Sequence, residues 1–340
     1  MRSFADQLIA WHSKSGRHHL PWQQTKDPYA IWVSEIMLQQ TQVVTVIKYY
    51  QRFIKKFPTL QTLAYADEEE VMKLWSGLGY YRRARFLYGG AQMIMNEMGG
   101  KFPSDFEMMM QIPGIGRSSA GAIAAFAFNQ KKAILDGNVK RVLARYFLIT
   151  QWTGLPKIEK KLWDFAESLL PAKKIDTYTQ ALMDLGATLC NKTPQCHLCP
   201  LKKTCLAFLQ NKVQLVPIPK PKKKIPTKTA EMFIIKHHDE ILVVKQSQGG
   251  IWGGLWSLPQ FERKAMTAQT WIKKYFGLDT WLIKKNLKAS TTFTHYKLKI
   301  IYSIFEAKSQ HAKSPHSWLS LSSIEGSATP AIIKKILLKL

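Results

Sequence analysis

The sequence is short of acidic side chains. Its 340 residues hold 23 Asp and Glu against 49 Lys and Arg, so the formal net charge is +26 and the isoelectric point lies near 9.9. Such a basic excess is not typical of an enzyme of small-molecule metabolism. It indicates a polyanionic partner, with nucleic acid ahead of a membrane surface, and binding that weakens steeply as salt is added.

Long apolar runs are missing as well. No stretch approaches about 18 consecutive apolar residues, so we expect no helix that spans a membrane. The N-terminal stretch MRSFADQLIAWHSK carries an acid early and lacks the apolar core and cleavage site of a signal peptide. We therefore expect a cytoplasmic protein. Because the sequence shows neither an internal repeat nor a dimerisation seam, we also expect a monomer.

Cysteine is scarce and confined to one place: Cys190, Cys196, Cys199 and Cys205. This grouping is typical of a metal site and not of a secreted disulfide framework. Four thiolates could hold Zn²⁺ or a [4Fe–4S] cluster. Zinc ribbons usually show two C-x2-C pairs, and here only Cys196 and Cys199 form one, so the spacing favours the cluster.

The length predicts two domains. Residues 212–228 are rich in lysine and proline and contain no acid, so they indicate an extended linker that could lie along DNA. Residues 1–211 predict helices. Residues 229–340 predict an α+β domain, with strands over 231–236, 240–245 and within 291–305, and a last helix that Thr329 caps and Pro330 begins.

One acidic residue stands in a long uncharged stretch. Asp27 followed by Pro28 is a strong helix start, because Asp can cap the helix and Pro suits its first position. From Pro28 to Ile47 the only charged residue is Glu35. Burial in such surroundings would raise the pKa of its carboxyl and make it an acid near neutral pH. Alternatively, Glu35 points outward on a half-exposed helix or pairs with a distant arginine.

A helix, a tight turn and a second helix are predicted near residue 114. Ser104 is expected to cap a helix over 105–111, PGIG makes the turn, and small apolar residues continue as a helix over Arg117–Phe128. Glycines let the backbone approach a ligand, and the free N–H groups at the start of the second helix suit one DNA phosphate. An ordinary loop between packed helices would give the same pattern.

A second carboxyl follows the apolar run Ala133–Leu135. Asp136 lies where a new helix is expected, at about residues 138–149, so its ordinary role would be that of an N-cap. Further helices are expected over 157–170 and 177–189. A carboxylate at a helix N-terminus stays ionised more readily than one in apolar surroundings, so Asp136 could be the anion and Glu35 the acid of a pair.

Two other turns carry side chains that could contact DNA. The glutamines in LQQTQ, residues 38–42, could link two helices or fill a hole in a DNA stack. GLGYYRR, residues 77–83, ends a helix predicted over 66–76. It could be a wedge and clamp for a kinked duplex, or a packed turn beside a basic helix.

Six segments, in this order, resemble the MutY-type adenine DNA glycosylases of the helix-hairpin-helix superfamily, relatives of endonuclease III. They are LPWQQTKDPYAIWVSEIMLQQTQV, GLGYYRRAR, IPGIGRSSAGAI, LDGNVKRVLAR, the four-cysteine loop and FTHYKLKI. The resemblance covers nearly the whole chain. It implies an all-α glycosylase region over 1–211, made of a six-helix bundle and a [4Fe–4S] cluster subdomain. It also implies an α+β Nudix-like domain over 229–340 that recognises 8-oxoguanine.

The resemblance implies a substrate, a reaction and its residues. The substrate would be duplex DNA with adenine opposite 8-oxoguanine or guanine, and the product an abasic site. Glu35 would protonate the leaving adenine, Asp136 would face the cationic sugar, and the four cysteines would bind the cluster. The chemistry agrees, because breaking an N-glycosidic bond needs an acid on the base and a fixed negative charge near the sugar.

The resemblance also implies the DNA contacts, with Gln40 and Tyr80 filling the gap left by adenine and the hairpin binding a phosphate. The full set is Gln39, Gln40, Tyr80, Pro113, Gly114, Gly116, Arg117, Ser118, Lys140, Phe293, Thr294 and His295. Endonuclease III-like enzymes have a lysine that forms a Schiff base where this chain has Ser118. A hydroxyl cannot do so, hence we expect a monofunctional enzyme. Lys140, near Asp136 in the sequence, could give weak lyase activity.

The sequence departs from the family in three places. Five residues separate Cys190 from Cys196 where six are usual, and Phe293-Thr294-His295 replaces Phe-Ser-His. The Nudix-like domain lacks the acidic REXXEE-type run, so we expect it to bind no catalytic Mg²⁺ and to hydrolyse no nucleotide. Two other hypotheses are a bifunctional glycosylase/lyase of the endonuclease III type and a non-enzymatic DNA-binding protein with structural zinc.

Overall fold

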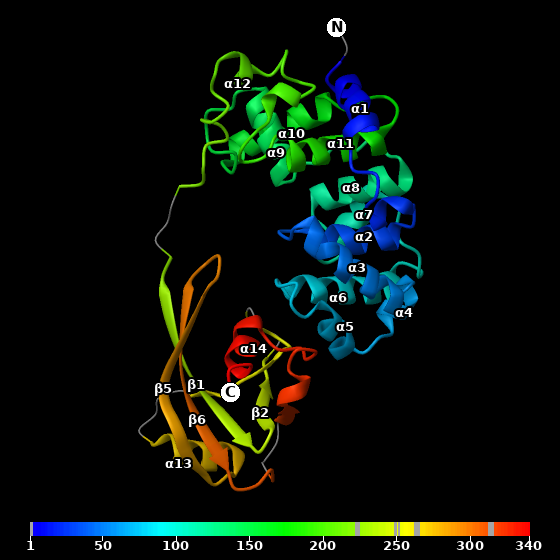
Figure 1. Cartoon of the computed structure of the whole chain (residues 1–340). Helices are drawn as coiled ribbons and strands as arrows, with labels where there is room; N and C mark the ends of the chain where they lie inside the picture. The colour runs from blue at the N-terminus through cyan, green and yellow to red at the C-terminus, as the bar shows by residue number, and fades with distance from the viewer. Residues whose placement is uncertain (1–2, 222–224, 248–249, 251, 262–265, 312–315) are drawn as a thin grey trace. The chain divides into compact units, whose positions relative to one another are not determined.

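The computed structural model describes residues 3–221, 225–247, 250, 252–261, 266–311 and 316–340 (Figure 1). The chain divides into two compact units. The first consists of Met1–Tyr65 and Phe86–Lys222, and the second of Ala66–Arg85 and Lys223–Leu340. A short piece of the N-terminal region therefore belongs to the same unit as the C-terminal residues.

The first unit is helical. Its elements are α1 (Phe4–Ser15), η1 (Pro21–Gln24), α2 (Pro28–Leu38), α3 (Val43–Lys56), α4 (Leu60–Ala64), most of α6 (Arg82–Glu97), α7 (Phe106–Gln111), α8 (Arg117–Phe128), α9 (Gly137–Tyr146), α10 (Pro156–Ser168), α11 (Ile175–Thr188), η2 (Cys196–Leu198) and α12 (Leu206–Leu209). Among the residues that the structure describes, no helix combines the length and apolar content needed to cross a membrane.

Local signals set several helix ends. The Asp27 side chain accepts a hydrogen bond from the Tyr29 N–H, and Pro28 begins α2, as predicted. The predicted helix over Arg117–Phe128 is confirmed as α8. The predicted cap of the preceding helix is wrong by one residue. Asp105, not Ser104, accepts from the Met108 N–H, because the carboxylate is correctly spaced for a cap.

The core of this unit is formed where α1, α9, α10 and α11 meet. Its fully buried members include Leu8, Leu143, Leu162 and Leu185. Burying each such side chain contributes about 1.5–3 kcal/mol relative to its exposure. This core fixes α9 and α11 against each other, and both helices contribute side chains to the cavity described below.

Two glycines bring the segment around Asp136 into close contact with its neighbours. A Cβ on Gly121 of α8 would lie 2.3 Å from the Ala133 carbonyl oxygen. A Cβ on Gly186 of α11 would lie 2.7 Å from the Asn138 Cβ. Only glycine permits approaches this close, so the segment that carries Asp136 is held between α8 and α11.

The second unit is built on a mixed sheet with strand order β3-β2-β1-β6-β5, in which β1 and β6 are parallel. The elements are α5 (Glu68–Trp75), β1 (Thr227–His237), β2 (Glu240–Lys245), β3 (Trp256–Ser257), β4 (Gln260–Phe261), α13 (Ala268–Phe276), β5 (Thr280–Thr292), β6 (Lys297–Ala307), β7 (Ser317–Ser320), η3 (Leu321–Ser323) and α14 (Ala331–Leu337). The predicted α+β fold is thus confirmed.

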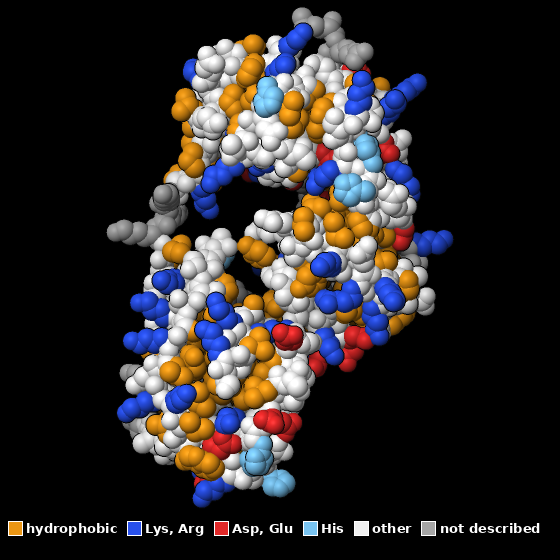
Figure 2. Space-filling model, viewed as in Figure 1, with side chains coloured by type: hydrophobic (Ala, Val, Ile, Leu, Met, Phe, Trp, Pro, Cys, Tyr) orange, Lys and Arg blue, Asp and Glu red, His pale blue; other side chains and the backbone are white. Residues whose placement is uncertain are grey.

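Lys and Arg outnumber Asp and Glu on the face shown in Figure 2.

Two predictions for this unit need correction. Strand β5 begins at Thr280, well before the predicted region, so the loop at residues 293–296 joins two long antiparallel strands. The N-cap of α14 is Pro330, not Thr329. The Thr329 hydroxyl is buried and accepts a hydrogen bond from the Ser327 hydroxyl at 2.9 Å instead.

The close contact at Gly121 predicts opposite effects for two glycine substitutions within helices. Gly121→Ala should lower the free energy of unfolding by about 1–3 kcal/mol, because its Cβ would strike the Ala133 carbonyl. Gly89→Ala, in α6, places its Cβ in open space and should raise stability by about 0.5–1 kcal/mol. Urea unfolding of both variants checks this, and equal effects would contradict it.

Candidate active site

A cavity of about 500 Å³ lies within the first unit. Its lining comes from the segment before α2 and from α2, α8, α11 and the start of α9. Glu35 and Asp136 both line it, so the structure brings together the two carboxyls that the sequence places 101 residues apart. The volume is sufficient for a purine base together with part of its sugar.

Glu35 projects from α2 between the buried residues Ser34 and Ile36. Burial raises the pKa of its carboxyl to about 8, with a smaller contribution from the charge of Asp136. The carboxyl is therefore protonated near neutral pH, as an acid that donates a proton must be. The predicted rise in this pKa is confirmed.

Asp136 is the N-cap of α9. Its Oδ1 accepts a hydrogen bond of 2.8 Å from the Val139 N–H, and its Oδ2 accepts one of 3.3 Å from the Asn138 amide. Burial nevertheless raises its pKa, while these donors and the charge of Arg141 act in the opposite direction. The prediction from the helix N-terminus left out burial, which opposes ionisation of Asp136. Of the two carboxyls, Asp136 is the one that accepts hydrogen bonds from Val139 and Asn138, which stabilise its ionised form.

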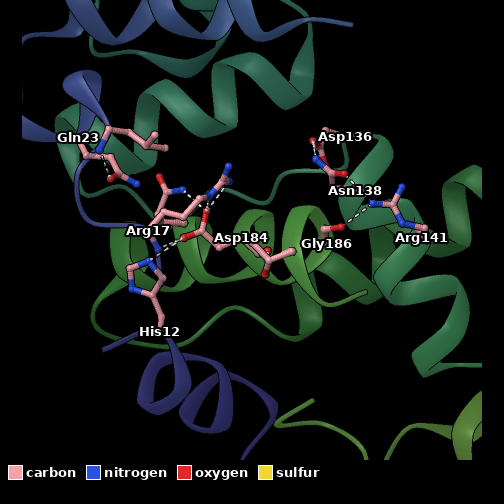
Figure 3. Close-up of polar contacts among 11 residues, drawn as sticks. His12, Arg17, Gln23, Asp136, Asn138, Arg141, Asp184 and Gly186 are labelled. Carbon is pink, nitrogen blue, oxygen red and sulfur yellow. Dashed lines mark hydrogen bonds and ion pairs between the residues drawn. The ribbon is translucent and has the colours of Figure 1, made fainter. Parts of the chain in front are cut away.

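A chain of hydrogen bonds leads from Asp136 to the cysteine-rich loop, and Figure 3 shows its part from Asp136 to Gly186. Asn138, which donates to Asp136, accepts through Oδ1 from the Arg141 guanidinium at 2.7 Å. Arg141 also donates to the carbonyls of Gly186 and Cys190, each at 2.7 Å. The geometry of the cap is thereby linked to the end of α11 and to the first cysteine.

Sequence reasoning missed a buried ion pair beside the cavity. Asp184 of α11 is fully buried and accepts from the Arg17 side chain at 2.6 and 2.8 Å and from the Arg17 N–H at 2.8 Å (Figure 3). The His12 ring lies 3.3 Å away. Burial opposes ionisation of Asp184, but the His12 and Arg17 contacts outweigh it and lower its pKa. The available signal was an acid within an apolar helix, as at Glu35.

Asp184 also orients a side chain in the lining of the cavity. Gln180 donates its amide N–H to Asp184 at 2.9 Å. An ionised carboxylate only accepts hydrogen bonds, so the amide nitrogen of Gln180 must face Asp184 and its oxygen must face elsewhere. The cavity thus contains an oriented amide that sequence reasoning did not single out.

The predicted hairpin joins α7 to α8. Gly114 has φ of +83°, and a Cβ there would lie 3.0 Å from the Phe86 Cβ, so this turn requires glycine. Gly116 caps α8 without a side chain, and a Cβ on it would meet open space. The first N–H groups of α8 therefore have no side-chain cap. Pro113 precedes these glycines in the turn.

Several predicted side chains meet around this hairpin. The Gln39 amide lies 3.3 Å from both the Gly114 carbonyl and the Ser119 hydroxyl. The Ser118 hydroxyl accepts a hydrogen bond of 3.0 Å from the Leu135 N–H and lines the cavity. Ser118 thereby holds the residue immediately before Asp136.

Two predicted cations are engaged elsewhere. Lys140 pairs with Glu159 and is not among the residues that line the cavity, so its closeness to Asp136 in the sequence does not place it in the site. Arg117 pairs with Glu167, and its guanidinium lies 4.0 Å from the centre of the Trp163 ring. Both acids come from α10, which belongs to the first unit.

Gln40 and Tyr80 occupy exposed turns in left-handed backbone conformations. Gln40 follows α2 in the first unit with φ of 57°, and Tyr80 lies in the second unit with φ of 50°. Such φ values are uncommon for side chains larger than glycine, and strain of this kind is frequent at functional sites. The side chains of Gln40 and Tyr80 are both exposed to solvent.

The loop between β5 and β6 carries Phe293, Thr294 and His295. Phe293 is half-buried and packs against Tyr296 and Trp252, with ring centres 5.3 and 6.3 Å apart. Thr294 and His295 are exposed at the tip. The aromatic residue anchors the loop, and the two polar side chains are available to a ligand.

The cysteine loop encloses a second, smaller cavity, which all four thiols line. Its other walls are mainly apolar, and Arg145 donates to the Cys190 sulfur at 3.4 Å while the Cys205 thiol donates to the Arg145 carbonyl at 3.5 Å. Burial raises the pKa of the Cys199 thiol to about 12. Within the described ranges, no three His, Cys, Asp or Glu side chains are close enough to hold a single metal ion. The four thiols thus share one cavity without converging on one point.

The chain matches two known families. Residues 33–168 match the HhH-GPD superfamily base excision DNA repair proteins, and residues 231–339 match the NUDIX domain. The adenine DNA glycosylase of Buchnera aphidicola subsp. Acyrthosiphon pisum is 38% identical over 340 residues, covering 98% of this chain and 96% of that protein. The human adenine DNA glycosylase is 43% identical over 215 residues, covering 60% of this chain and 39% of that protein.

Solved structures resemble the helical region. A thermostable thymine-DNA glycosylase aligns with a TM-score of 0.56 and 30% identity, covering 61% of this chain and 95% of that one. Endonuclease III in a non-covalent complex with DNA aligns with a TM-score of 0.52 and 20% identity, covering 61% of this chain and 94% of that one. The second likeness is one of fold alone.

The buried acid predicts how stability depends on pH. The folded chain holds the Glu35 proton until about pH 8, whereas the ordinary pKa of the group is 4.5. The contribution of Glu35 to the free energy of unfolding should therefore be greatest below about pH 4.5. It should fall by up to about 1.4 kcal/mol per pH unit as pH rises toward 8. Because the Gln side chain stays neutral, Glu35→Gln should not show this fall. The difference in free energy of unfolding between variant and wild type should therefore shift in favour of the variant as pH rises over this range.

Urea unfolding of wild type and Glu35→Gln at a series of pH values measures this difference, and the exposed Glu107→Gln is the matched control. The control should track the wild type. A Glu35→Gln difference that does not change between pH 5 and pH 8 would show that the Glu35 carboxyl is not held neutral.

Proposed function

Because the chain belongs to the adenine DNA glycosylase family, we propose that it removes adenine opposite 8-oxoguanine or guanine in duplex DNA, and that it does so without cutting the strand. Removal of adenine from DNA in base excision repair follows from the family itself. The observation that carries the finer proposal is the shared cavity of a neutral Glu35 and a hydrogen-bonded Asp136. We expect the enzyme to act in the cell compartment that holds the DNA.

Two carboxyls in one cavity suit hydrolysis of an N-glycosidic bond. When the bond between adenine N9 and C1′ breaks, its electron pair leaves with the base and positive charge develops on the sugar. Glu35 holds the proton that the leaving base takes up. Asp136 supplies negative charge toward C1′. Water then bonds to C1′ and releases a proton, which replaces the one that Glu35 gave to the base, so the products are free adenine and an abasic site.

The cavity also suits recognition of an extruded adenine. Moving the base out of the stack costs roughly a few kcal/mol, which contacts in the cavity must offset. Gln180 faces Asp184 with its nitrogen, which leaves its oxygen as an acceptor for a donor such as the adenine amino group. Trp22 and Leu38 supply apolar walls.

Ser118 supports the monofunctional part of the proposal. Its hydroxyl cannot form an imine with the abasic sugar, and it already accepts the Leu135 N–H. Lys140, which lies near Asp136 in the sequence, pairs with Glu159. We therefore propose that water, and not a lysine amine, completes the reaction at C1′.

The hairpin and exposed turns suit a DNA backbone and a gap in the stack. The uncapped N–H groups after Gly116 favour a phosphate, and the net charge of +26 favours the duplex as a whole. Gln40 and Tyr80 are proposed to occupy the space beside the orphaned base. Thr294 and His295, held by Phe293, are proposed to contact 8-oxoguanine.

The four cysteines are proposed to hold a [4Fe–4S] cluster. The thiols line one largely apolar cavity, and only Cys196 and Cys199 form the C-x2-C pair of which a zinc ribbon usually has two. When bound, the cluster would cross-link the end of α11 to α12 and so stabilise the loop that Arg141 and Arg145 contact. No chemical step on adenine needs it.

A glycosylase assay tests the proposed reaction. Duplexes with adenine opposite 8-oxoguanine should show strand breaks only after hot alkali, and cleavage opposite guanine should be slower. The single-turnover rate should fall as pH rises past about 8, because Glu35 loses its proton there. Glu35→Gln should lower the rate at least about 100-fold. Glu107→Gln should leave it unchanged.

Complete strand cleavage before alkali would replace the proposal with a bifunctional glycosylase/lyase. Equal rates opposite 8-oxoguanine, guanine, cytosine and thymine would remove the proposed opposite-base preference while leaving the adenine chemistry in place. Full activity of Glu35→Gln would remove the assigned acid.

Metal analysis tests the cysteine site. The purified chain should contain iron and inorganic sulfide in equal amounts, and Cys196→Ser should reduce both and increase proteolysis of residues 190–205. His197→Ala, at an exposed neighbouring position, should retain them. Zinc in place of iron would show that the site holds a different metal.

A further inference from the structure

The turn that carries Tyr80 belongs to the same unit as the loop that carries Thr294. Residues 66–85 group with Lys223–Leu340, although they lie far from them in the sequence. Specific contacts within this unit hold the turn at both of its ends. In the proposed function Tyr80 and Thr294 both contact the base opposite adenine, so these contacts affect how the two side chains act together.

The first end is Ser76, at the end of α5. Its hydroxyl donates to the Ser327 carbonyl at 2.9 Å and accepts from the Lys334 ammonium at 2.7 Å. Lys334, from α14, also donates to the Glu325 carbonyl at 2.6 Å. The Ser327 side chain is buried. One lysine thus ties the start of the turn to the segment before the last helix.

The second end is Arg85, in the first turn of α6. Its guanidinium donates to the Gly253 carbonyl. Gly253 follows Trp252, whose ring packs against Phe293, and Phe293 anchors the loop with Thr294 at its tip. A continuous set of contacts therefore runs from the end of the Tyr80 turn to the proposed 8-oxoguanine loop.

Between its ends the turn is braced. The Trp75 indole N–H and the Arg83 guanidinium both donate to the Gly79 carbonyl at 3.1 Å. The Arg83 guanidinium lies 5.4 Å from the ring centres of both Trp75 and Tyr80. A turn braced in this way passes a displacement of its ends on to the Tyr80 side chain.

We propose that the Ser76–Lys334 contact is a positioning contact that makes Tyr80 and the Phe293–His295 loop act as one reader of the base opposite adenine. This inference rests on the proposed function, in which both side chains meet that base. Fixed together, the two can engage 8-oxoguanine at once, so that a misfit at Thr294 also displaces Tyr80. Ser76 and Lys334 themselves touch neither the base nor the sugar.

The test compares single-turnover rates for adenine opposite 8-oxoguanine with rates for adenine opposite guanine. Lys334→Met and Ser76→Ala should each reduce this preference by about tenfold, the usual effect of losing hydrogen bonds to partly buried groups. Lys334→Arg, which retains a donor, should restore most of it. Lys335→Met, the exposed neighbour, should have no effect.

A double-mutant cycle separates a positioning role from a merely structural one. Thr294→Ala and Ser76→Ala should not combine independently, so the double variant should lose little more preference than Thr294→Ala alone. The pH at which the single-turnover rate falls, because Glu35 loses its proton, should be the same in these variants as in the wild type. Independent, multiplicative losses, or full preference in Lys334→Met, would overturn the inference.

Failure of the inference differs from failure of the proposed function. If the wild type prefers 8-oxoguanine and both Lys334→Met and Ser76→Ala keep that preference, the positioning contact is wrong and the proposed function stands. If the wild type shows no preference, the proposed function fails in this part, and the inference fails with it.

Discussion

Asp136 reaches the cavity because the chain around it approaches two helices more closely than any side chain would permit. Gly121 admits the Ala133 carbonyl on one side, and Gly186 admits Asn138 on the other. The Ser118 hydroxyl then holds the Leu135 N–H. Without these contacts a capping aspartate would be an ordinary feature of a helix start. With them, its position is set by three contacts from two helices, α8 and α11.

The same packing separates the roles of the two carboxyls. Glu35 lies on an apolar helix, where burial is the main cause of its raised pKa and the charge of Asp136 adds to it. Asp136 is also buried, yet Val139 and Asn138 donate to it and Arg141 adds positive charge. The hydrogen-bond donors and Arg141 therefore favour the anion at Asp136 more than at Glu35. That asymmetry is what an acid and an anion acting on the same nucleoside require.

Signals that act over a few residues could be predicted from the sequence, and contacts over long distances could not. Asp27 with Pro28 marked α2 correctly, and the small apolar residues of 117–128 marked α8. Ser104 failed as a cap because the neighbouring Asp105 serves the same purpose one position later. The Arg17–Asp184 pair spans 167 residues, so no local pattern reveals it.

Strand β5 shows a second limit. Its residues 281–286 are all exposed, so the alternation that marks a half-buried strand begins only at Leu287. Its pairing with β6 alone defines it, and that pairing fixes the loop at Thr294. The predicted role of Thr294 came from a short motif, whereas its place at the tip of a long hairpin needed the structure.

In the proposed function, removal of adenine and contact with the opposite base belong to different units. Every residue that lines the larger cavity lies in Met1–Tyr65 or Phe86–Lys222, whereas Tyr80 and Thr294 lie in the second unit. Residues 66–85 belong to the second unit, although they lie between the two segments of the helical unit in the sequence. Tyr80, the proposed wedge, therefore belongs to the same unit as the proposed 8-oxoguanine loop. The proposed acid and anion belong to the other unit, so substitutions that alter the proposed selectivity need not alter the cavity.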